Sequence, residues 1–142
     1  MEQNLSRLIA FLARKSQACL GSVLDKYNLS VAELPFFVAL QNCAGITQEE
    51  ITAMVCVDKA VTTRAVKSLE VKGYLSRVRD EKDRRQNRLY ATEAAKKLGE
   101  PVERDLLHLN DLLTQGIEPE HLTLIYESIL KMEKNLADIL RR

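Results

Sequence analysis

The sequence lacks the features of secreted, disulfide-rich and membrane-spanning proteins. Its three cysteines, Cys19, Cys43 and Cys56, are odd in number and far apart. They have the spacing of neither a disulfide framework nor a zinc site, so we interpret them as reduced, buried thiols. No apolar run approaches the roughly 18 residues of a membrane span, and the N-terminus lacks a basic-then-apolar signal segment. We therefore expect a cytoplasmic protein without a membrane partner.

Residues suited to catalysis or metal binding are also scarce. The two histidines, His108 and His121, are thirteen positions apart, which favours surface or helix-terminus positions over a metal site. The chain has no glycine-rich phosphate loop, and no serine, cysteine or threonine has an evident histidine partner. We expect neither an enzyme nor a bound metal or cofactor.

Charge is balanced over the whole chain but not along it. The 21 basic and 20 acidic residues give a net charge of +1. Residues 58–97 hold twelve basic and six acidic side chains, whereas the segments before and after this block are slightly negative, at −1 and −4. A positive block in a neutral protein is expected where one face meets nucleic-acid phosphates. Clustering on an ordinary solvated surface is the alternative.

Long amphipathic helices are predicted at both ends of the chain. Apolar residues recur at three- and four-residue spacing over 5–24 and again over 122–139. Thr92 can cap a further helix that runs to Gly116, with a bend expected at Pro101. The central sixty residues can cover these helices only in part, so we expect them to be buried against a second copy of the chain.

Two shorter helices are predicted between these ends. Ser30 with Glu33, and Thr47 with Glu50, have the spacing of a capping box, in which the first residue caps a helix and the fourth reaches back. Gly45 is expected to end the first of these helices, and Pro35 to distort its first turn.

A third short helix is predicted to begin immediately after the second. Asp58 can serve as its N-cap and Gly73 as its C-cap. Cys56 and Val57 leave room only for a sharp turn, which indicates a helix-turn-helix. The buried side of this helix is predicted to be Thr62, Ala65, Val66 and Leu69.

The outer side of that helix is predicted to contact DNA, because a helix fits the major groove and can present side chains to base edges there. Arg64 can bind guanine or a phosphate, and Thr63 can bond to either kind of target. Ala60 and Val61 can offer apolar contact, for example to a thymine methyl. The residues assigned to DNA are Lys59, Ala60, Val61, Thr63, Arg64 and Lys67.

A β hairpin with a charged tip is predicted to follow, with strands over 74–79 and 88–91. Its basic residues can approach a minor groove, where negative potential attracts arginine, while Asp83 pairs with a nearby arginine and holds the shape of the loop. The basic residues are Lys82, Arg84, Arg85 and Arg88. An ordinary solvated hairpin, or a winged helix used only for protein contacts, is the rival interpretation.

These segments together resemble the MarR (multiple antibiotic resistance regulator) family. The resemblance lies in residues 57–77, with Leu-Glu-x-Lys-Gly at 69–73, in Asp-Arg-Arg at 83–85 and in Leu-Tyr-Ala-Thr at 89–92. It implies a single, mainly α domain over 1–142 with a small β wing. Within it, 30–92 would form a winged helix-turn-helix, and 1–29 and 93–142 would form dimerisation helices.

The family resemblance also implies a function. It suggests a homodimeric repressor that binds pseudo-palindromic double-stranded DNA and is released by a small aromatic or phenolic effector or by oxidation. By this analogy Arg84 enters the minor groove and Arg85 braces the wing with Asp83. The sequence departs from the family pattern at Ala60 and Val61, where Ser and Thr are common, which puts the details of base recognition in doubt. It also departs at Ala91, where Leu is common before Thr92.

Two regulatory hypotheses follow from the resemblance. Some relatives sense peroxide through a cysteine near the start of the chain, but Cys19 lies on the apolar stripe, and the sensor's tyrosine positions hold Glu33 and Ala44. A buried filler thiol is therefore the favoured interpretation. Family effectors bind where the first, second and fifth helices meet, and Phe36, Phe37 and Arg14 are conceivable lining residues, although core packing explains the phenylalanines better.

Overall fold

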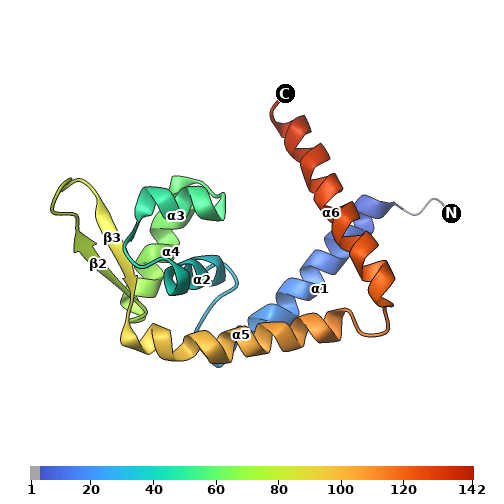
Figure 1. Ribbon diagram of the computed structural model, residues 1–142, viewed down its shortest axis with the longest axis horizontal. Coiled ribbons are helices and arrows are strands. Elements are labelled where there is room, and N and C mark those ends of the chain that lie inside the picture. Colours follow the sequence, from blue (N-terminus) through green and yellow to red (C-terminus); the bar gives the residue numbers. More distant parts are fainter. Residues whose placement is uncertain (1–3) are drawn as a thin grey trace. The chain divides into compact units, whose positions relative to one another are not determined.

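The computed structural model describes residues 4–142 as a mainly helical chain with a small antiparallel sheet (Figure 1). The predicted fold class is confirmed. The chain divides into two compact units, one ending at Leu106 and the other beginning at Leu107. The elements are α1 (Leu5–Asp25), α2 (Leu34–Asn42), β1 (Ile46–Thr47), α3 (Gln48–Val55), α4 (Lys59–Val71), β2 (Leu75–Arg79), β3 (Asn87–Ala91), α5 (Glu93–Leu113) and α6 (Pro119–Leu140).

Helix α1 carries the predicted apolar stripe, but most of that stripe is uncovered. Asn4 caps the helix by accepting the backbone N–H of Arg7 at 3.2 Å. Leu24 is the one fully buried residue of α1, while Leu5, Leu8, Ile9 and Leu12 are 47–54% exposed.

The prediction of buried thiols is wrong for two of the three cysteines. Cys19 and Cys56 are exposed, and Cys43 is partly buried. Cys19 lies on the uncovered part of α1, and Cys56 lies in a surface turn. Helical spacing showed which face carries the apolar residues, but it could not show what covers that face. Whether Cys19 is redox-active stays a prediction.

The Ser30–Glu33 capping box forms, one turn before the helix it was expected to open. The backbone N–H of Ser30 donates to Glu33 Oε1 at 2.8 Å, and the backbone N–H of Glu33 donates to Ser30 Oγ at 3.2 Å. Helix α2 then begins at Leu34. Pro35 therefore falls in the first two helical positions, where a missing N–H removes no hydrogen bond, rather than late in the first turn as predicted.

Helices α3 and α4 form the predicted helix-turn-helix. Thr47 Oγ1 caps α3 by accepting the backbone N–H of Glu50 at 3.1 Å, and Asp58 caps α4 by accepting that of Val61 at 2.8 Å. Cys56 makes the sharp turn between them in the left-handed conformation, with φ of 59°. The buried face of α4 is the predicted one, consisting of Thr62, Ala65, Val66 and Leu69.

The sheet has a third strand that the sequence analysis did not predict. Its order is β1-β3-β2, with β2 and β3 forming the hairpin visible beside α4 (Figure 1). Strand β1 pairs Ile46 with Leu89 and Thr47 with Arg88. Two residues directly before a helix, one of them its N-cap, give too little pattern for a strand to be recognised.

The core of the first unit lies beneath α2, α4 and the sheet. Phe36 and Phe37 are 1% and 2% exposed, which supports the core-packing interpretation of these phenylalanines. Phe37 meets the ring of Tyr74 edge to face, with 6.1 Å between centroids. The other fully buried large side chains are Leu24, Ile51, Leu69, Leu89, Val66, Val102 and Thr62.

Helix α5 begins at the cap that the sequence predicted. Thr92 Oγ1 accepts the backbone N–H of Ala95 at 3.3 Å, and Pro119 opens α6. Helix α5 continues through Pro101 as a single helix. Helix α6 has no buried residue and exposes an apolar face. Among the residues described, no helix is long and apolar enough to cross a membrane.

Candidate nucleic-acid interface

The outer face of α4 is exposed over nearly all of its predicted length. Lys59, Ala60, Thr63, Arg64 and Lys67 are exposed, since the apolar positions of the helix turn its other side toward the core. Val61 departs from the prediction in part: it is half-buried and packs against the core. Its backbone N–H is taken by the cap of Asp58. Val61 therefore has less surface to offer a base than Ala60.

The hydroxyl of Thr63 is already bonded within the protein. It donates to the backbone carbonyl of Lys59 at 2.9 Å and lies 3.1 Å from Gln48 Nε2, which donates to it. Gln48 is the first residue of α3, so it brings a side-chain amide to the exposed face of α4. The sequence analysis did not identify Gln48, because its position depends on how α3 crosses α4. The one signal in the sequence was the position of Gln48 directly after Thr47, the cap of α3, at the start of the helix-turn-helix.

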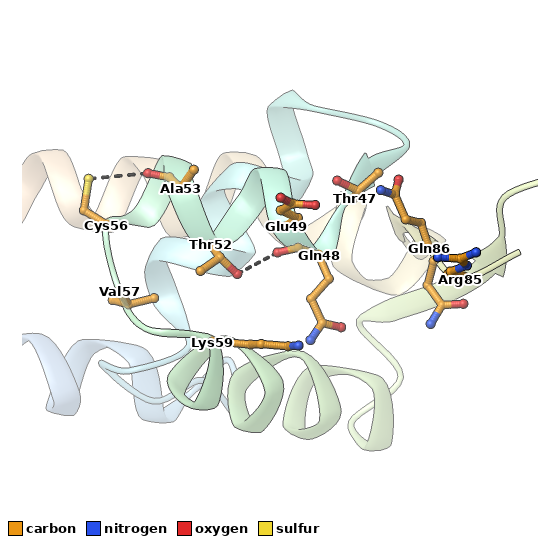
Figure 2. A pocket seen from close by; sticks show the side chains of 11 residues that line it. Thr47, Gln48, Glu49, Thr52, Ala53, Cys56, Val57, Lys59, Arg85 and Gln86 are labelled. Carbon is orange, nitrogen blue, oxygen red and sulfur yellow. Dashed lines mark hydrogen bonds between the residues drawn. The ribbon is translucent and has the colours of Figure 1, made fainter. Parts of the chain in front are cut away.

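A groove of about 740 Å³ lies between α3, the start of α4 and the loop between β2 and β3, residues 80–86, which we call the wing loop. Figure 2 shows Gln48 and Lys59 pointing toward one another between the two helices, with Arg85 and Gln86 beside Thr47. One basic side chain thus comes from the helix-turn-helix and another from the wing. The lining residues are Thr47, Gln48, Glu49, Thr52, Ala53, Cys56, Val57, Lys59, Arg85, Gln86 and Asn87.

The wing loop is shaped by two aspartates that accept backbone N–H groups. Asp80 Oδ1 accepts from Lys82 at 3.0 Å, and Asp83 Oδ1 accepts from Arg85 at 3.1 Å. Such turns are a usual role for aspartate in loops. Asp83 therefore contacts Arg85, but through the arginine backbone. The expected pairing with an arginine side chain does not form: within residues 4–142, no ion pair includes Asp83.

Arg88 faces the body of the protein rather than the tip of the wing. Its guanidinium donates to the backbone carbonyl of Gly45 at 2.8 Å and pairs with Asp80 at 3.2 Å. The backbone N–H of Lys82 and then the charge of Arg88 hold the pKa of Asp80 below its ordinary value. The prediction grouped Arg88 with the DNA-binding residues. In the structure, its hydrogen-bonding groups join the wing to the loop before β1.

The remaining basic residues of the predicted interface are exposed and unpaired. Within the part of the chain that the structure describes, no acidic side chain forms an ion pair with any of them. We call them the free cations: Lys59, Arg64, Lys67, Lys82, Arg84 and Arg85. The paired cations of the same positive block are Lys72, Arg77, Arg88 and Lys96, which contact Glu33, Glu70, Asp80 and Glu93.

Comparison with known proteins assigns this arrangement to a family. The model of the MarR family matches residues 30–86, from the Ser30 turn to the wing loop. The crystal structure of a MarR transcriptional regulator from Methanosarcina mazei Go1 is 30% identical. Its TM-score is 0.82, and the match covers 95% of this chain and 97% of that one. This chain belongs to the MarR family.

A curated relative places this MarR protein among transcriptional regulators, and a further solved structure shares its fold. This MarR protein is 25% identical to the uncharacterized HTH-type transcriptional regulator YybA of Bacillus subtilis (strain 168), over 94% of this chain and 89% of that protein. A putative MarR family transcriptional regulator from Listeria monocytogenes, whose crystal structure is complexed with 26mer DNA, has the same fold. Its TM-score is 0.81 at 22% identity, covering 96% of this chain and 91% of that one. The MarR chain is a DNA-binding transcriptional regulator and not an enzyme.

Proposed function

We propose that this MarR protein is a homodimeric repressor that binds a pseudo-palindromic operator through α4 and the wing. The observation that carries the proposal is the set of free cations. They lie on the outer face of α4 and on the wing loop, while the paired cations of the same block are taken up by carboxylates. Exposed, unpaired positive charge is what a phosphate backbone attracts.

On α4, Arg64 is the proposed base-contacting residue, and Lys59 and Lys67 are proposed phosphate contacts. Arginine can donate two parallel hydrogen bonds to guanine, which lysine cannot do with the same planar geometry. Ala60 and the exposed part of Val61 offer apolar contact. Gln48 joins this set, because its amide lies beside Thr63, whose own hydrogen atom is used within α4.

On the wing, Arg84 is proposed to enter a minor groove, with Lys82 and Arg85 at the phosphates beside it. The turns made by Asp80 and Asp83 support this assignment, because they fix the backbone that carries these three side chains. Arg88 is proposed to hold the wing in place, on account of its bonds to Gly45 and Asp80.

The homodimer is proposed from two uncovered apolar faces. Helix α1 exposes Leu5, Leu8, Ile9 and Leu12, and α6 exposes Ile125, Ile129, Leu136 and Ile139, each by 40% or more. Faces of this kind are typical of interfaces between subunits. We therefore keep 1–29 and 93–142 as the proposed dimerisation helices and 30–92 as the DNA-binding unit. Two-fold symmetry then calls for half-sites centred about 10 base pairs apart.

Release by a small aromatic effector is proposed at a groove between α2 and α5. The groove has a volume of about 360 Å³, within the range of small-molecule sites. Its apolar part is supplied by Phe37, Val102 and Leu106. Lys96, whose exposed pair with Glu93 is long at 3.4 Å, could exchange that partner for a carboxylate or phenolate. The other lining residues are Val38, Gln41, Asn42, Gly99, Glu100 and Glu103.

The proposed function is tested by fluorescence anisotropy with DNA from upstream of the protein's own coding sequence. We expect one preferred duplex, and affinity that falls steeply with salt. A protein that binds no duplex more tightly than a scrambled one would contradict the proposal.

The effector site is tested by release of DNA with salicylate. Salicylate should release DNA from the unmodified protein and from Lys97→Ala, but less from Lys96→Ala. Lys97 is the matched control, because it is exposed and does not line the groove.

A further inference from the structure

One buried carboxylate in the first unit has no part in the proposed DNA contacts. Glu33 lies in the connection between α1 and α2 and is 3% exposed. Its Oε1 accepts the backbone N–H of Ser30 at 2.8 Å and Nζ of Lys72 at 2.6 Å, and its Oε2 accepts the hydroxyl of Ser68 at 2.5 Å. Ser68 lies in the last turn of α4, and Lys72 is its C-cap. Glu33 therefore binds the end of α4 directly.

Two further hydrogen bonds join the same connection to the end of α4. Nζ of Lys72 also donates to the backbone carbonyl of Asn28 at 2.9 Å. Two residues beyond it, the hydroxyl of Tyr74 donates to the backbone carbonyl of Tyr27 at 2.6 Å. The residues after α1 are thus held at the α4 terminus through two backbone carbonyls and one buried side chain.

The connection is fastened to α5 at its other end. Nζ of Lys26 pairs with Asp105 Oδ2 at 2.5 Å, and the hydroxyl of Tyr27 donates to the same oxygen. The hydrogen bonds from Lys26 and then Tyr27 hold the pKa of Asp105 below its ordinary value, so the carboxylate is charged at neutral pH. Residues 26–33 are therefore bonded at one end to Asp105 on α5 and at the other to Ser68 and Lys72 at the end of α4.

A contact of this kind is better suited to fixing geometry than to adding stability. Taking a charge pair out of water costs much of what the pair gains, and well-packed apolar residues would often stabilise the fold as well. Hydrogen bonds, by contrast, are directional. In a buried cluster, all the polar groups must have their partners in the same arrangement, because an unpaired polar group is costly there. Among the described residues, no buried side-chain polar atom lacks a partner. The Glu33 cluster thus allows one position for the end of α4 and disfavours others.

The cluster lies close to the proposed base-contacting residue. Ser68 follows Arg64 by four residues, about 6 Å along a helix axis, on the turn that comes next. Base contacts need side chains placed within hydrogen-bonding distance of specific atoms. A small rotation of the α4 terminus would therefore be felt at Arg64 and Lys67.

We propose that Glu33 is a positioning residue for DNA recognition, which holds the end of α4 on the connection between α1 and α2. The proposal rests on the proposed function, in which α4 contacts the bases. Through this carboxylate, the orientation of α4 follows that of the helices on which residues 26–33 are anchored. Glu33 itself does not touch DNA.

The test compares Glu33→Gln with Glu70→Gln in the full chain. Each variant removes one negative charge next to α4, and charge alone would make both bind DNA slightly more tightly. Glu70 is the matched control, because it is exposed and its carboxylate, among the described residues, accepts hydrogen bonds only from Arg77. We expect Glu33→Gln to bind the preferred duplex about tenfold more weakly, the equivalent of one misaligned base contact, and to lose preference over a scrambled duplex. Glu70→Gln should retain both.

Equal affinity and equal preference in these two variants would overturn the proposal. Thermal unfolding by circular dichroism sets an assay temperature at which both are folded. If Glu33→Gln does not fold, Ser68→Ala carries the same test, because it changes no charge and removes one bond of the cluster. We expect Ser68→Ala to lose preference for the duplex, and an unchanged preference would refute the positioning role. An unmodified protein without any duplex preference would instead refute the proposed function.

Discussion

The free cations and the paired cations come from one positive block of sequence, yet the fold uses them in opposite ways. Lys59, Arg64 and Lys67 extend from α4 without a carboxylate partner within the described residues. Lys72, a few residues later, is bound by the buried Glu33. On the wing the same division separates Arg84 from Arg88. Charge along a sequence therefore locates a binding face only approximately.

The division also separates two kinds of consequence. A free cation can be removed at little cost to the fold, because its charge is already in water. A paired cation that is removed leaves a carboxylate behind, and the cost depends on how deeply that carboxylate is buried. Removing a free cation should therefore weaken DNA binding and leave stability unchanged. Removing a paired cation should lower stability and affect DNA binding only indirectly.

The largest expected effect is on stability, in Lys72→Ala. This change leaves Glu33 buried beside Ser68 without its cationic partner, which costs about 3–5 kcal/mol in the free energy of unfolding. Arg77→Ala, which breaks the exposed pair with Glu70, should cost about 0–1 kcal/mol. Urea unfolding of both variants measures the difference. Equal losses in the free energy of unfolding would mean that burial of the carboxylate partner does not set the cost of removing the cation.

The next largest effect is on DNA binding, in Arg64→Ala. The loss of a base contact should weaken binding to the preferred duplex by roughly 1–3 kcal/mol and reduce preference for it. Arg77→Ala is the control, since it removes the same charge from a paired residue of the same block. Anisotropy titrations with preferred and scrambled duplexes separate these effects. A loss that is equal on both duplexes would make Arg64 a phosphate contact.

A smaller effect is expected from the ionisation of Glu33. Burial alone would raise the pKa of this carboxyl, but the hydrogen bonds from Lys72, Ser68 and Ser30 outweigh it and lower the pKa below the ordinary value. A lowered folded-state pKa stabilises the fold above the ordinary glutamate value near pH 4, and this stabilisation is lost as the pH falls through the folded-state pKa. Urea unfolding should therefore show less acid destabilisation in Glu33→Gln than in the unmodified protein.

The smallest expected effect is that of Arg88→Ala on the wing. Removing this side chain should loosen the hairpin, because it breaks the bonds to Gly45 and Asp80. Hydrogen exchange of the backbone N–H groups of β2 and β3 should become faster, while exchange in α4 stays unchanged. Unchanged exchange in the strands would show that the β pairing alone holds the wing.

Local signals in the sequence were sufficient for most of the elements. Asp58, Thr47 and Thr92 form the caps that their types and positions indicated, and the four buried residues of α4 were identified from helical spacing. These features depend on neighbours within about one turn of the chain. For the same reason, Pro35 was placed wrongly: a capping box shows that a turn forms, but not whether the helix starts in that turn.

The features that the sequence did not reveal depend on partners far along the chain. Arg88 bonds to Gly45, 43 residues earlier in the chain, and Lys72 bonds to Glu33, 39 residues earlier. Gln48 reaches Thr63 only because α3 and α4 cross as they do. The exposure of Cys19 likewise depends on which segments cover α1, and the spacing of apolar residues within α1 does not contain that information. The candidate interface could therefore be located from sequence, but its free and paired cations could not be separated.

The salt dependence of DNA binding tests this separation most directly. Measured by anisotropy for the unmodified protein, Arg84→Ala and Arg88→Ala, the slope of log affinity against log salt reports how many counterions are released by the positive charges that each variant brings to the DNA. We predict a slope reduced in magnitude by roughly one for Arg84→Ala and unchanged for Arg88→Ala. An unchanged slope for Arg84→Ala, with a reduced one for Arg88→Ala, would contradict the assignment of the free cations to DNA.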